Sequence, residues 1–150
     1  MELKVIPVVQ ILIAVLLMII FYKISPDLTL SWPAHLPVAL ALFFIAIVVG
    51  LCAIASFKKH KTTVNPTKPE TSSTVVSSGI YSFSRNPMYL AMLISLISLT
   101  YYLQHLASLP IILIFIGYIT RFQIIPGEKM LTKIFGQQYR DYQLKVRRWL

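Results

Sequence analysis

Four runs of apolar residues, almost free of charged side chains, constrain the fold of this chain more than any other feature. They span residues 5–22, 38–57, 88–106 and 109–125. A helix needs roughly 20 apolar residues to cross about 30 Å of hydrocarbon, a length that the first two runs meet and the last two approach. Because only a tight link around residues 105–110 separates the last two, we expect them to form a helical hairpin, tilted or not fully spanning.

The composition also indicates a membrane protein. Charged residues make up 13% of the chain and hydrophobic residues 57%, whereas soluble domains carry about 25% charged residues. The first run lacks the basic leader and the small-residue cleavage site of a secretory signal, so we expect it to be a permanent helix. We therefore predict an all-α integral membrane helix bundle with about four transmembrane helices. It forms a single domain, in which residues 1–57 supply the two N-terminal membrane helices and residues 58–150 the rest.

Lysine and arginine residues gather in two segments on the same predicted side of the membrane. The link after the second run and the tail from Arg121 on carry Lys58, Lys59, Lys61, Lys68, Arg85, Arg121, Lys129, Lys133, Arg140, Lys145, Arg147 and Arg148. The positive-inside rule places both segments, and with an even helix count both termini, in the cytoplasm. The net charge of +9 suits anionic lipid headgroups. Because the basic residues flank membrane spans and form no soluble domain, the sequence argues against a nucleic-acid partner.

Asn86 and Pro87 mark the expected start of the third helix. The side-chain oxygen of Asn86 can cap the first turn, and Pro87 suits the first helical position because its missing N–H needs no partner there. The positive end of the helix dipole then points at whatever binds near Arg85. The preceding link, residues 58–84, contains two prolines and a run of serine and threonine, and is predicted to be an extended loop.

Pro126 and Gly127 interrupt the fourth run. Beyond them, apolar residues recur every three or four positions, at Leu131, Phe135, Tyr139, Tyr142 and Val146. Basic side chains fall on the other sides, which predicts a C-terminal amphipathic helix at the level of the headgroups or capping the bundle.

Two charged residues at the membrane boundaries are the first candidates for a function. Arg85 is either an interfacial arginine that reaches the headgroups or a contact for an anion or carboxylate. Glu128 is one of only five acidic residues, and it needs a cationic partner, either Arg121, Arg85 or a ligand. A structural pair of Arg121 and Glu128 is the alternative to a binding site. Tyr81 and Tyr89, each taken alone, are explained as residues of an aromatic belt.

The sequence predicts no metal site. Its three histidines are scattered over separate loops and helix ends, without the spacing of metal ligands. Cys52 is the single cysteine and lies inside the second apolar run, which predicts a small packed core residue. No G-x-G-x-x-G fingerprint or P-loop occurs, so any nucleotide chemistry does not use a doubly wound domain.

Several motifs follow one another in the second half of the chain. They are Thr63-Val-Asn-Pro66, Lys68-Pro-Glu70, Gly79-x-Tyr81-x-x-x-Arg85-Asn-Pro-Met-Tyr89, Arg121-Phe-Gln, Pro126-x-Glu128-x-x-Leu131, Phe135-Gly136, Tyr139, Tyr142 and Val146-Arg-Arg-Trp149. In these motifs the chain resembles the integral-membrane methyltransferases of the isoprenylcysteine carboxyl methyltransferase and phospholipid methyltransferase group, most closely the short bacterial members. The resemblance covers about residues 62–150, and residues 5–57 share only the presence of membrane helices.

This resemblance implies a bacterial inner-membrane enzyme that uses S-adenosylmethionine (SAM) as methyl donor and a lipophilic carboxylate, amine or thiol as acceptor. The cofactor-binding residues that it implies are Tyr81, Arg85, Asn86, Pro87, Tyr89 and Glu128. Arg85 can hold the SAM carboxylate with paired hydrogen bonds, Glu128 can face a cationic group, and tyrosines can contact the sulfonium. Because in-line positioning can supply much of the rate acceleration, no catalytic residue is assigned.

Two positions depart from the pattern of this group. Many members have histidine where this chain has Asn86, and asparagine cannot act as a base near neutral pH. Many members also have paired glutamates where this chain has Gly127 and Glu128, so one carboxylate is missing. These departures keep open a second hypothesis, a non-catalytic membrane scaffold or subunit that retains the methyltransferase fold. The acceptor itself does not follow from the fold.

Overall fold

The computed structural model describes residues 7–59 and 74–150, and the regular secondary structure there is helical, as predicted. The long helices are α1 (Pro7–Ile24), α2 (His35–Lys59), α3 (Pro87–Leu103) and α4 (Ser108–Ile119). A π-helical segment, η4 (Thr120–Ile124), joins α4 to α5 (Ile125–Phe135), and α6 (Gln137–Lys145) follows. Two short 3-10 helices are η1 (Pro26–Leu28) and η3 (Gly79–Ser82). Residues 60–73 of the predicted loop, with the motifs at 63–70, lie outside the described residues.

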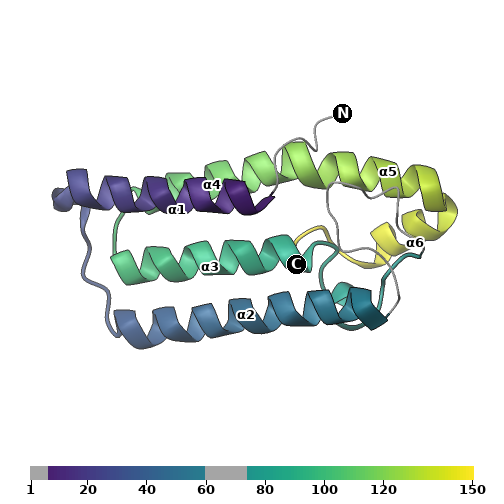
Figure 1. Ribbon diagram of the computed structural model, residues 1–150, viewed down its shortest axis with the longest axis horizontal. Coiled ribbons are helices and arrows are strands. Elements are labelled where there is room, and N and C mark those ends of the chain that lie inside the picture. Colours follow the sequence, from purple (N-terminus) through teal and green to yellow (C-terminus); the bar gives the residue numbers. More distant parts are fainter. Residues whose placement is uncertain (1–6, 60–73) are drawn as a thin grey trace.

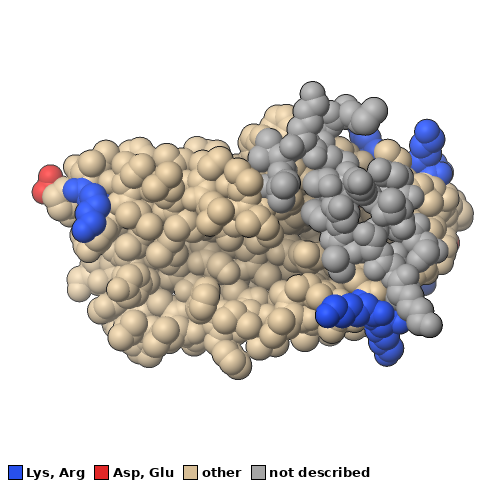
Figure 2. Space-filling model, in the orientation of Figure 1, with Lys and Arg blue, Asp and Glu red and all other residues tan. Residues whose placement is uncertain are grey.

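The helices run side by side, with α3 in the centre, α2 along one side of it and α1 and α4 along the other (Figure 1). The C-terminus returns to the start of α3 (Figure 1). We call the end of the bundle with the last turn of α2, the start of α3, α5 and α6 the basic end, and the end with Lys23 and Asp27 the opposite end. On the face shown in Figure 2, the charged side chains lie toward the two ends, and the surface between them carries none. This distribution fits a bundle that crosses a membrane.

Three stretches are long and apolar enough to cross a membrane, by length and composition: Pro7–Ile24, His35–Lys59 and Ser108–Phe135. The shorter α3 has 17 residues, and at 1.5 Å per residue it covers about 25 Å. It therefore falls a little short of the roughly 30 Å of a hydrocarbon core. The predicted α3–α4 hairpin is present, but its second helix is longer than the fourth apolar run.

Small residues form the contact between α2 and α3. Ala39, Ala46 and Ala53 recur every seven positions along α2 and are its buried residues. At Gly50, an added Cβ would lie 3.6 Å from the Cβ of Ala91 on α3. Lipid chains are as apolar as leucine, so helices in a bilayer associate through close packing, which small residues permit. Ala53 also packs with Val76 and Tyr81, in the segment before α3. The three alanines and Gly50, which we call the small-residue seam, thus hold α2 against α3 and the segment that precedes it.

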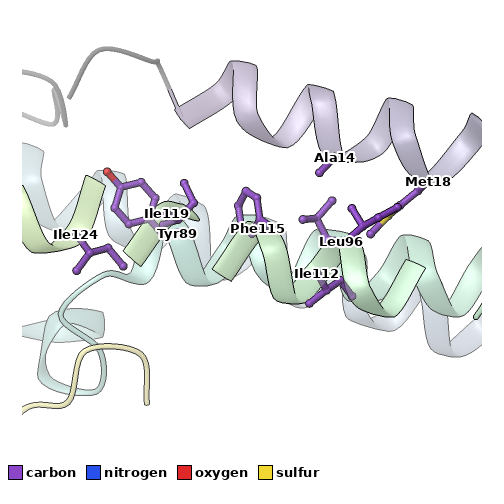
Figure 3. Packing of buried hydrophobic residues seen from close by; sticks show 9 residues of the cluster. Ala14, Met18, Tyr89, Leu96, Ile112, Phe115, Ile119 and Ile124 are labelled. Carbon is purple, nitrogen blue, oxygen red and sulfur yellow. The ribbon is translucent and has the colours of Figure 1, made fainter. Parts of the chain in front are cut away.

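An apolar core joins α1, α3 and α4 on the other side. Ala14 and Met18 of α1 point toward Leu96 of α3 and Ile112 of α4 (Figure 3). Toward the basic end, the same core continues to Tyr89 near the start of α3. Because α3 is packed on one side by the small-residue seam and on the other by this core, the position of its first turn is fixed.

The helix that begins at Ser108 does not end at Pro126, contrary to the prediction. The N–H of Ile125 donates to the carbonyl of Thr120, five residues earlier, which makes this turn π-helical. In a regular α-helix, proline leaves one carbonyl without a donor and its ring clashes with the carbonyl four residues before it. A wider turn directly before Pro126 relieves this clash, so the helix continues through Pro126 and Gly127 to Phe135.

The predicted C-terminal amphipathic helix is two helices, because the chain turns at Gly136. This glycine has φ +54°, a conformation that other residues rarely adopt. The apolar face of the predicted amphipathic segment is nevertheless present, since Tyr139, Tyr142 and Val146 are buried together and apolar residues of α5 pack against them. The single-helix prediction was wrong, but the turn brings the rest of the chain back toward α3 (Figure 1).

Cys52 is exposed on α2, so the prediction of a packed core residue was wrong. The fully buried residues of α2 are the alanines at positions 39, 46 and 53, and Cys52 lies outside that row, next to Ala53. A cysteine inside an apolar run is therefore not buried by protein when its helix packs along one stripe only.

The small-residue seam predicts the effect of enlarging Ala46. Ala46→Leu should destabilise the bundle by about 1–3 kcal/mol, since the larger side chain cannot fit between two closely packed helices. Unfolding in mixtures of a mild detergent and dodecyl sulfate measures this. The matched control is Leu51→Phe, which adds volume to a side chain that is 61% exposed and should change little. Equal destabilisation by both variants would contradict the seam.

Candidate functional site

The candidate site lies at the basic end, where the C-terminal segment meets the start of α3. Pro87 and Asn86 occupy the first helical and N-cap positions, as predicted. The prediction that the Asn86 side chain caps the helix was wrong, because Asn86 makes no side-chain capping bond. Its Nδ2 instead donates to the carbonyl of Arg148 at 2.9 Å. The folded-back segment brings this acceptor within reach, so the amide joins α3 to the end of the chain.

Further contacts hold α6 and the C-terminal segment, residues 146–150, in place. The backbone N–H of Arg85 donates to the carbonyl of Arg147 at 3.1 Å. The Tyr142 hydroxyl donates to the carbonyl of Tyr81 at 2.7 Å, and Trp149 packs against the edge of the apolar core. Side-chain, backbone and apolar contacts therefore all fix the tail over the loop that precedes α3.

Glu128, in the first turn of α5, is the centre of an ion-pair cluster and is only 10% exposed. Arg148 holds both carboxylate oxygens, with Nε 3.1 Å from Oε1 and Nη2 2.7 Å from Oε2. Nη1 of Arg85 lies 3.2 Å from Oε1. A carboxylate so well shielded from water needs cations beside it, and the paired geometry with Arg148 is one of the strongest that an arginine makes. We call Arg85, Glu128 and Arg148 the charge cluster.

Arg85 retains hydrogen-bonding capacity within this cluster. Its side chain is 10% exposed, and its contact with Glu128 is an ion pair without hydrogen-bond geometry. Within residues 7–59 and 74–150, its buried Nε and Nη1 have no hydrogen-bond partner. A buried donor without an acceptor costs free energy, so a ligand that supplied one would be stabilised. A carboxylate or phosphate oxygen is the kind of acceptor that such a guanidinium donor favours.

Buried tyrosines lie around the charge cluster. Burial raises the pKa of Tyr139 to about 12, and the charge of Glu128 adds to this, whereas the charge of Arg85 and a hydrogen bond with it act in the opposite direction. Burial also raises the pKa of Tyr142 and of Tyr81 above the usual value. These hydroxyls are therefore neutral at physiological pH, where they can donate or accept hydrogen bonds but do not act as tyrosinate bases.

Tyr81 and Tyr89, which the resemblance places on one wall of a site, belong to different packing groups. Tyr81 is buried in η3 with its ring 5.1 Å from that of Phe57 on α2, and Tyr89 lies in the apolar core. Both side chains are buried, which is not the surface position of aromatic-belt residues.

The alternative pair of Arg121 and Glu128 is not formed. Arg121 is exposed and its guanidinium lies 5.8 Å from the ring centroid of Phe122. His105 is buried at the opposite end, with Nε2 2.8 Å from the carbonyl of Ser25. In the described part of the chain, no group of three histidine, cysteine or acidic residues could hold a metal ion.

Arg148 is the residue that the sequence reasoning missed. Its hydrogen bonds with Glu128 raise its pKa, and its side chain is 37% exposed. Two signals could have found it: the Arg147-Arg148-Trp149 motif, and the need of Glu128 for a cation. Neither signal shows that the chain reverses at Gly136, so the pairing could not be inferred from spacing along a single helix.

The phospholipid methyltransferase family matches residues 34–138, from the start of α2 into α6. The chain belongs to this family. It falls in the isoprenylcysteine carboxyl methyltransferase-like group of membrane methyltransferases, which confirms the resemblance. The match contains Arg85 and Glu128 but neither α1 nor Arg148. The matched region therefore leaves out α1, which packs in the apolar core, and the C-terminal segment, which closes the site.

A shorter relative is also similar to part of the chain. It is an uncharacterized protein of Haemophilus influenzae, 43% identical over 63 residues, which cover 42% of this chain and 100% of that protein. No solved structure matches the chain.

The hydrogen bond from Asn86 predicts a local effect on the tail. Asn86→Ala removes a bond worth about 1 kcal/mol, so the backbone amide of Arg85, which donates to Arg147, should exchange with deuterium about fivefold faster. Hydrogen exchange followed by mass spectrometry measures this. Gln137→Ala is the control, because the Gln137 side-chain amide donates to Asp141 on the exposed surface. Unchanged exchange at Arg85 in the Asn86 variant would show that the tail does not depend on this bond.

The raised pKa of Tyr139 predicts a loss of stability at alkaline pH. A pKa of about 12 in the folded protein against 10 in the unfolded chain means that the folded state binds the proton more tightly. The stability that the folded protein gains from this tighter proton binding is complete below pH 10 and is lost as the pH rises from 10 to 12. Tyr139→Phe should flatten the pH dependence of the thermal midpoint in that interval. Tyr102→Phe, at a tyrosine that is 54% exposed, should leave the dependence unchanged.

Proposed function

We propose that this chain is an integral-membrane methyltransferase that uses SAM as methyl donor and methylates a lipophilic acceptor. Family membership supports the general class. The observation that carries the cofactor assignment is the pair of buried Arg85 donors, Nε and Nη1, which have no hydrogen-bond partner among the described residues and lie beside Glu128. SAM has a carboxylate for such an arginine and two cationic groups for a glutamate, so its charges complement those of the site.

In this proposal Arg85 binds the carboxylate of SAM. The position of Arg85 follows from Asn86 and Pro87, which fix the start of α3. Glu128 shares its oxygens between Arg148 and a cationic group of SAM. The rings of Tyr81 and Tyr89 supply faces that attract a sulfonium. When bound, SAM supplies an electrophilic methyl group, and these residues hold it in one orientation.

The acceptor brings its own nucleophile, a carboxylate, an amine or a thiol. The tyrosines around the charge cluster outside the spans stay protonated, because their pKa values are raised, so they do not serve as bases at neutral pH. Alignment of nucleophile, methyl carbon and sulfur then accounts for much of the acceleration. Because the site lies at the end of apolar helices, a lipophilic acceptor can reach it from the bilayer.

We also propose that the basic end faces the cytoplasm of a bacterial inner membrane, with both termini on that side. The basic residues of the last turns of α2 and of α5 and α6 support this orientation, as the positive-inside rule requires. Among the residues that the structure describes, α1 and η1 bring Lys23 and Asp27 to the opposite end. Cytoplasmic SAM would then have direct access to the site.

A second candidate function is a non-catalytic scaffold. The observation that favours it is the closed contact of Glu128 with Arg148, in which both carboxylate oxygens are already engaged. Such a cluster can hold the tail in place without any ligand. The two candidates differ in one measurable property, because a scaffold need not bind SAM.

Calorimetric titration of the purified protein with SAM in mild detergent tests the assignment. Wild-type protein should show saturable binding, and Arg85→Ala should weaken it at least about 30-fold, since loss of one partner of a buried charge contact costs roughly 2–5 kcal/mol. Glu128→Gln, which keeps the shape and removes the charge, should also weaken binding strongly.

Arg121→Ala is the matched control for the arginine substitution, because Arg121 precedes the same helix α5 but is exposed. It should bind SAM like the wild type. Wild-type affinity in the Arg85 and Glu128 variants would sink the site assignment, and the absence of saturable binding to wild-type protein would favour the scaffold.

A further inference from the structure

The C-terminal tail is held by the same residues that the proposed function assigns to the charged groups of SAM. The side-chain amide of Asn86 donates to the carbonyl of Arg148 at 2.9 Å. The backbone N–H of Arg85 donates to the carbonyl of Arg147 at 3.1 Å, and the Glu128 carboxylate accepts from the Arg148 side chain at 3.1 and 2.7 Å. Ligand binding at these residues can therefore be coupled to the attachment of the tail.

Arg148 is the outermost member of the charge cluster. Its side chain is 37% exposed, whereas those of Arg85 and Glu128 are each 10% exposed. It gives each carboxylate oxygen of Glu128 a hydrogen bond, but the contact of Arg85 with Glu128 lacks hydrogen-bond geometry. Holding a glutamate side chain in one rotamer costs conformational entropy. With Arg148 in place, this ordering of Glu128 precedes the binding of any ligand.

The attached tail leaves binding capacity free in the cluster. An ionised carboxylate offers about four acceptor positions, of which Arg148 uses one on each oxygen of Glu128. The Nε and Nη1 donors of Arg85 have no hydrogen-bond partner within residues 7–59 and 74–150. Two arginines face one glutamate, so a ligand carboxylate at Arg85 would balance the charge. A ligand with a carboxylate beside a cation thus fits the cluster without displacing Arg148.

We propose that Arg148 is a positioning residue for SAM. Its guanidinium holds the Glu128 carboxylate in the orientation that meets a cationic group of SAM, and it acts through Glu128 without touching the substrate. Bound SAM in turn contacts Glu128 and Arg85 and strengthens the attachment of the tail. This inference rests on the proposed function, which names SAM as the ligand. Arg148 lies beyond residues 34–138, so the family match does not assign it this role.

Calorimetric titration with SAM in mild detergent compares two neighbouring arginines. Arg148→Ala should weaken binding about tenfold, within the usual range for coupling between two sites. Arg147→Ala is the matched control, because it removes the same charge from an exposed side chain, and it should bind SAM like the wild type. Wild-type affinity in Arg148→Ala would overturn the proposal. Tighter binding would also overturn it, since Arg148 would then compete with SAM for Glu128.

Arg148→Lys is the second variant and carries the test if Arg148→Ala does not fold. Lysine keeps the positive charge but cannot form the paired hydrogen bonds of a guanidinium. Its affinity for SAM should lie between those of the wild type and Arg148→Ala. Wild-type affinity in Arg148→Lys would show that the charge alone suffices, and it would reject the orientation of Glu128 by the paired hydrogen bonds.

Chemical rescue distinguishes the orientation of Glu128 from a purely structural role of the tail. Guanidinium at low millimolar concentration supplies the group that Arg148→Ala lacks, without a covalent link to the tail. It should restore much of the SAM affinity of Arg148→Ala and leave Arg147→Ala unchanged. If rescue fails although the thermal midpoint without SAM equals that of the wild type, Arg148 acts through the tail only and is not a positioning residue.

Digestion of the full chain with a carboxypeptidase of broad specificity tests the reverse effect, that of SAM on the tail. After Leu150, the enzyme releases Trp149, which must first leave the edge of the apolar core. When opening is fast relative to cleavage, the rate of release follows the open population. Saturating SAM should slow the release of Trp149 severalfold in the wild type and less in Arg148→Ala. Unchanged or accelerated release would overturn the coupling.

Failure of this inference and failure of the proposed function give different results. If the wild type shows no saturable SAM binding, the proposed function is wrong and the inference falls with it. If the wild type binds SAM, and Arg85→Ala weakens binding while neither Arg148 variant does, the proposed function stands and the role of Arg148 is rejected.

Discussion

The close approach of α2 and α3 is the contact on which the rest of the structure depends. In a bilayer the helices gain little by burying apolar surface against one another, so backbone proximity has to provide the attraction. The alanines at positions 39, 46 and 53 permit it. Because α3 is then held from one side by α2 and from the other by the core with α1 and α4, its first turn has one position. Arg85 and Asn86 are placed by apolar packing that begins several turns away.

The charge cluster has a different basis. A carboxylate shielded from water between two arginines contributes little net stability, because desolvation offsets most of the attraction. Its effect is to specify geometry: Arg148 brings the tail to Glu128, and Asn86 and the backbone of Arg85 bind the same segment. The contacts that position the proposed cofactor site are thus the contacts that close the tail over it. A ligand at Arg85 would therefore bind to a site in which the C-terminal tail is already attached to α3 and α5.

The sequence predicts what depends on composition and local chemistry. The apolar runs, the start of α3 at Pro87 and the boundary positions of Arg85 and Glu128 follow from hydropathy, proline chemistry and the cost of a charge near lipid. The pairing of Glu128 with Arg148 could not be predicted, because it depends on the reversal at Gly136 and on tertiary contacts of the tail. The orientation of Cys52 was missed for a similar reason: hydropathy gives the span of a helix but not which of its faces is covered by protein.

The π-helical turn shows how a local irregularity positions a distant charge. Ile119 and Ile124 are both buried, although residues five apart on a regular α-helix point about 140° away from each other. The wider turn at residues 120–124 brings them onto one side, and Glu128, four residues after Ile124, continues that row into the charge cluster. If residues 120–124 formed a regular α-helical turn, Glu128 would be rotated by about 100°, the angle of one residue, away from Arg85. Pro126, which favours the wider turn, is therefore a cause of the inward direction of Glu128. Hydropathy alone does not reveal this turn, because Phe122 keeps the spacing of apolar residues at three after Ile119.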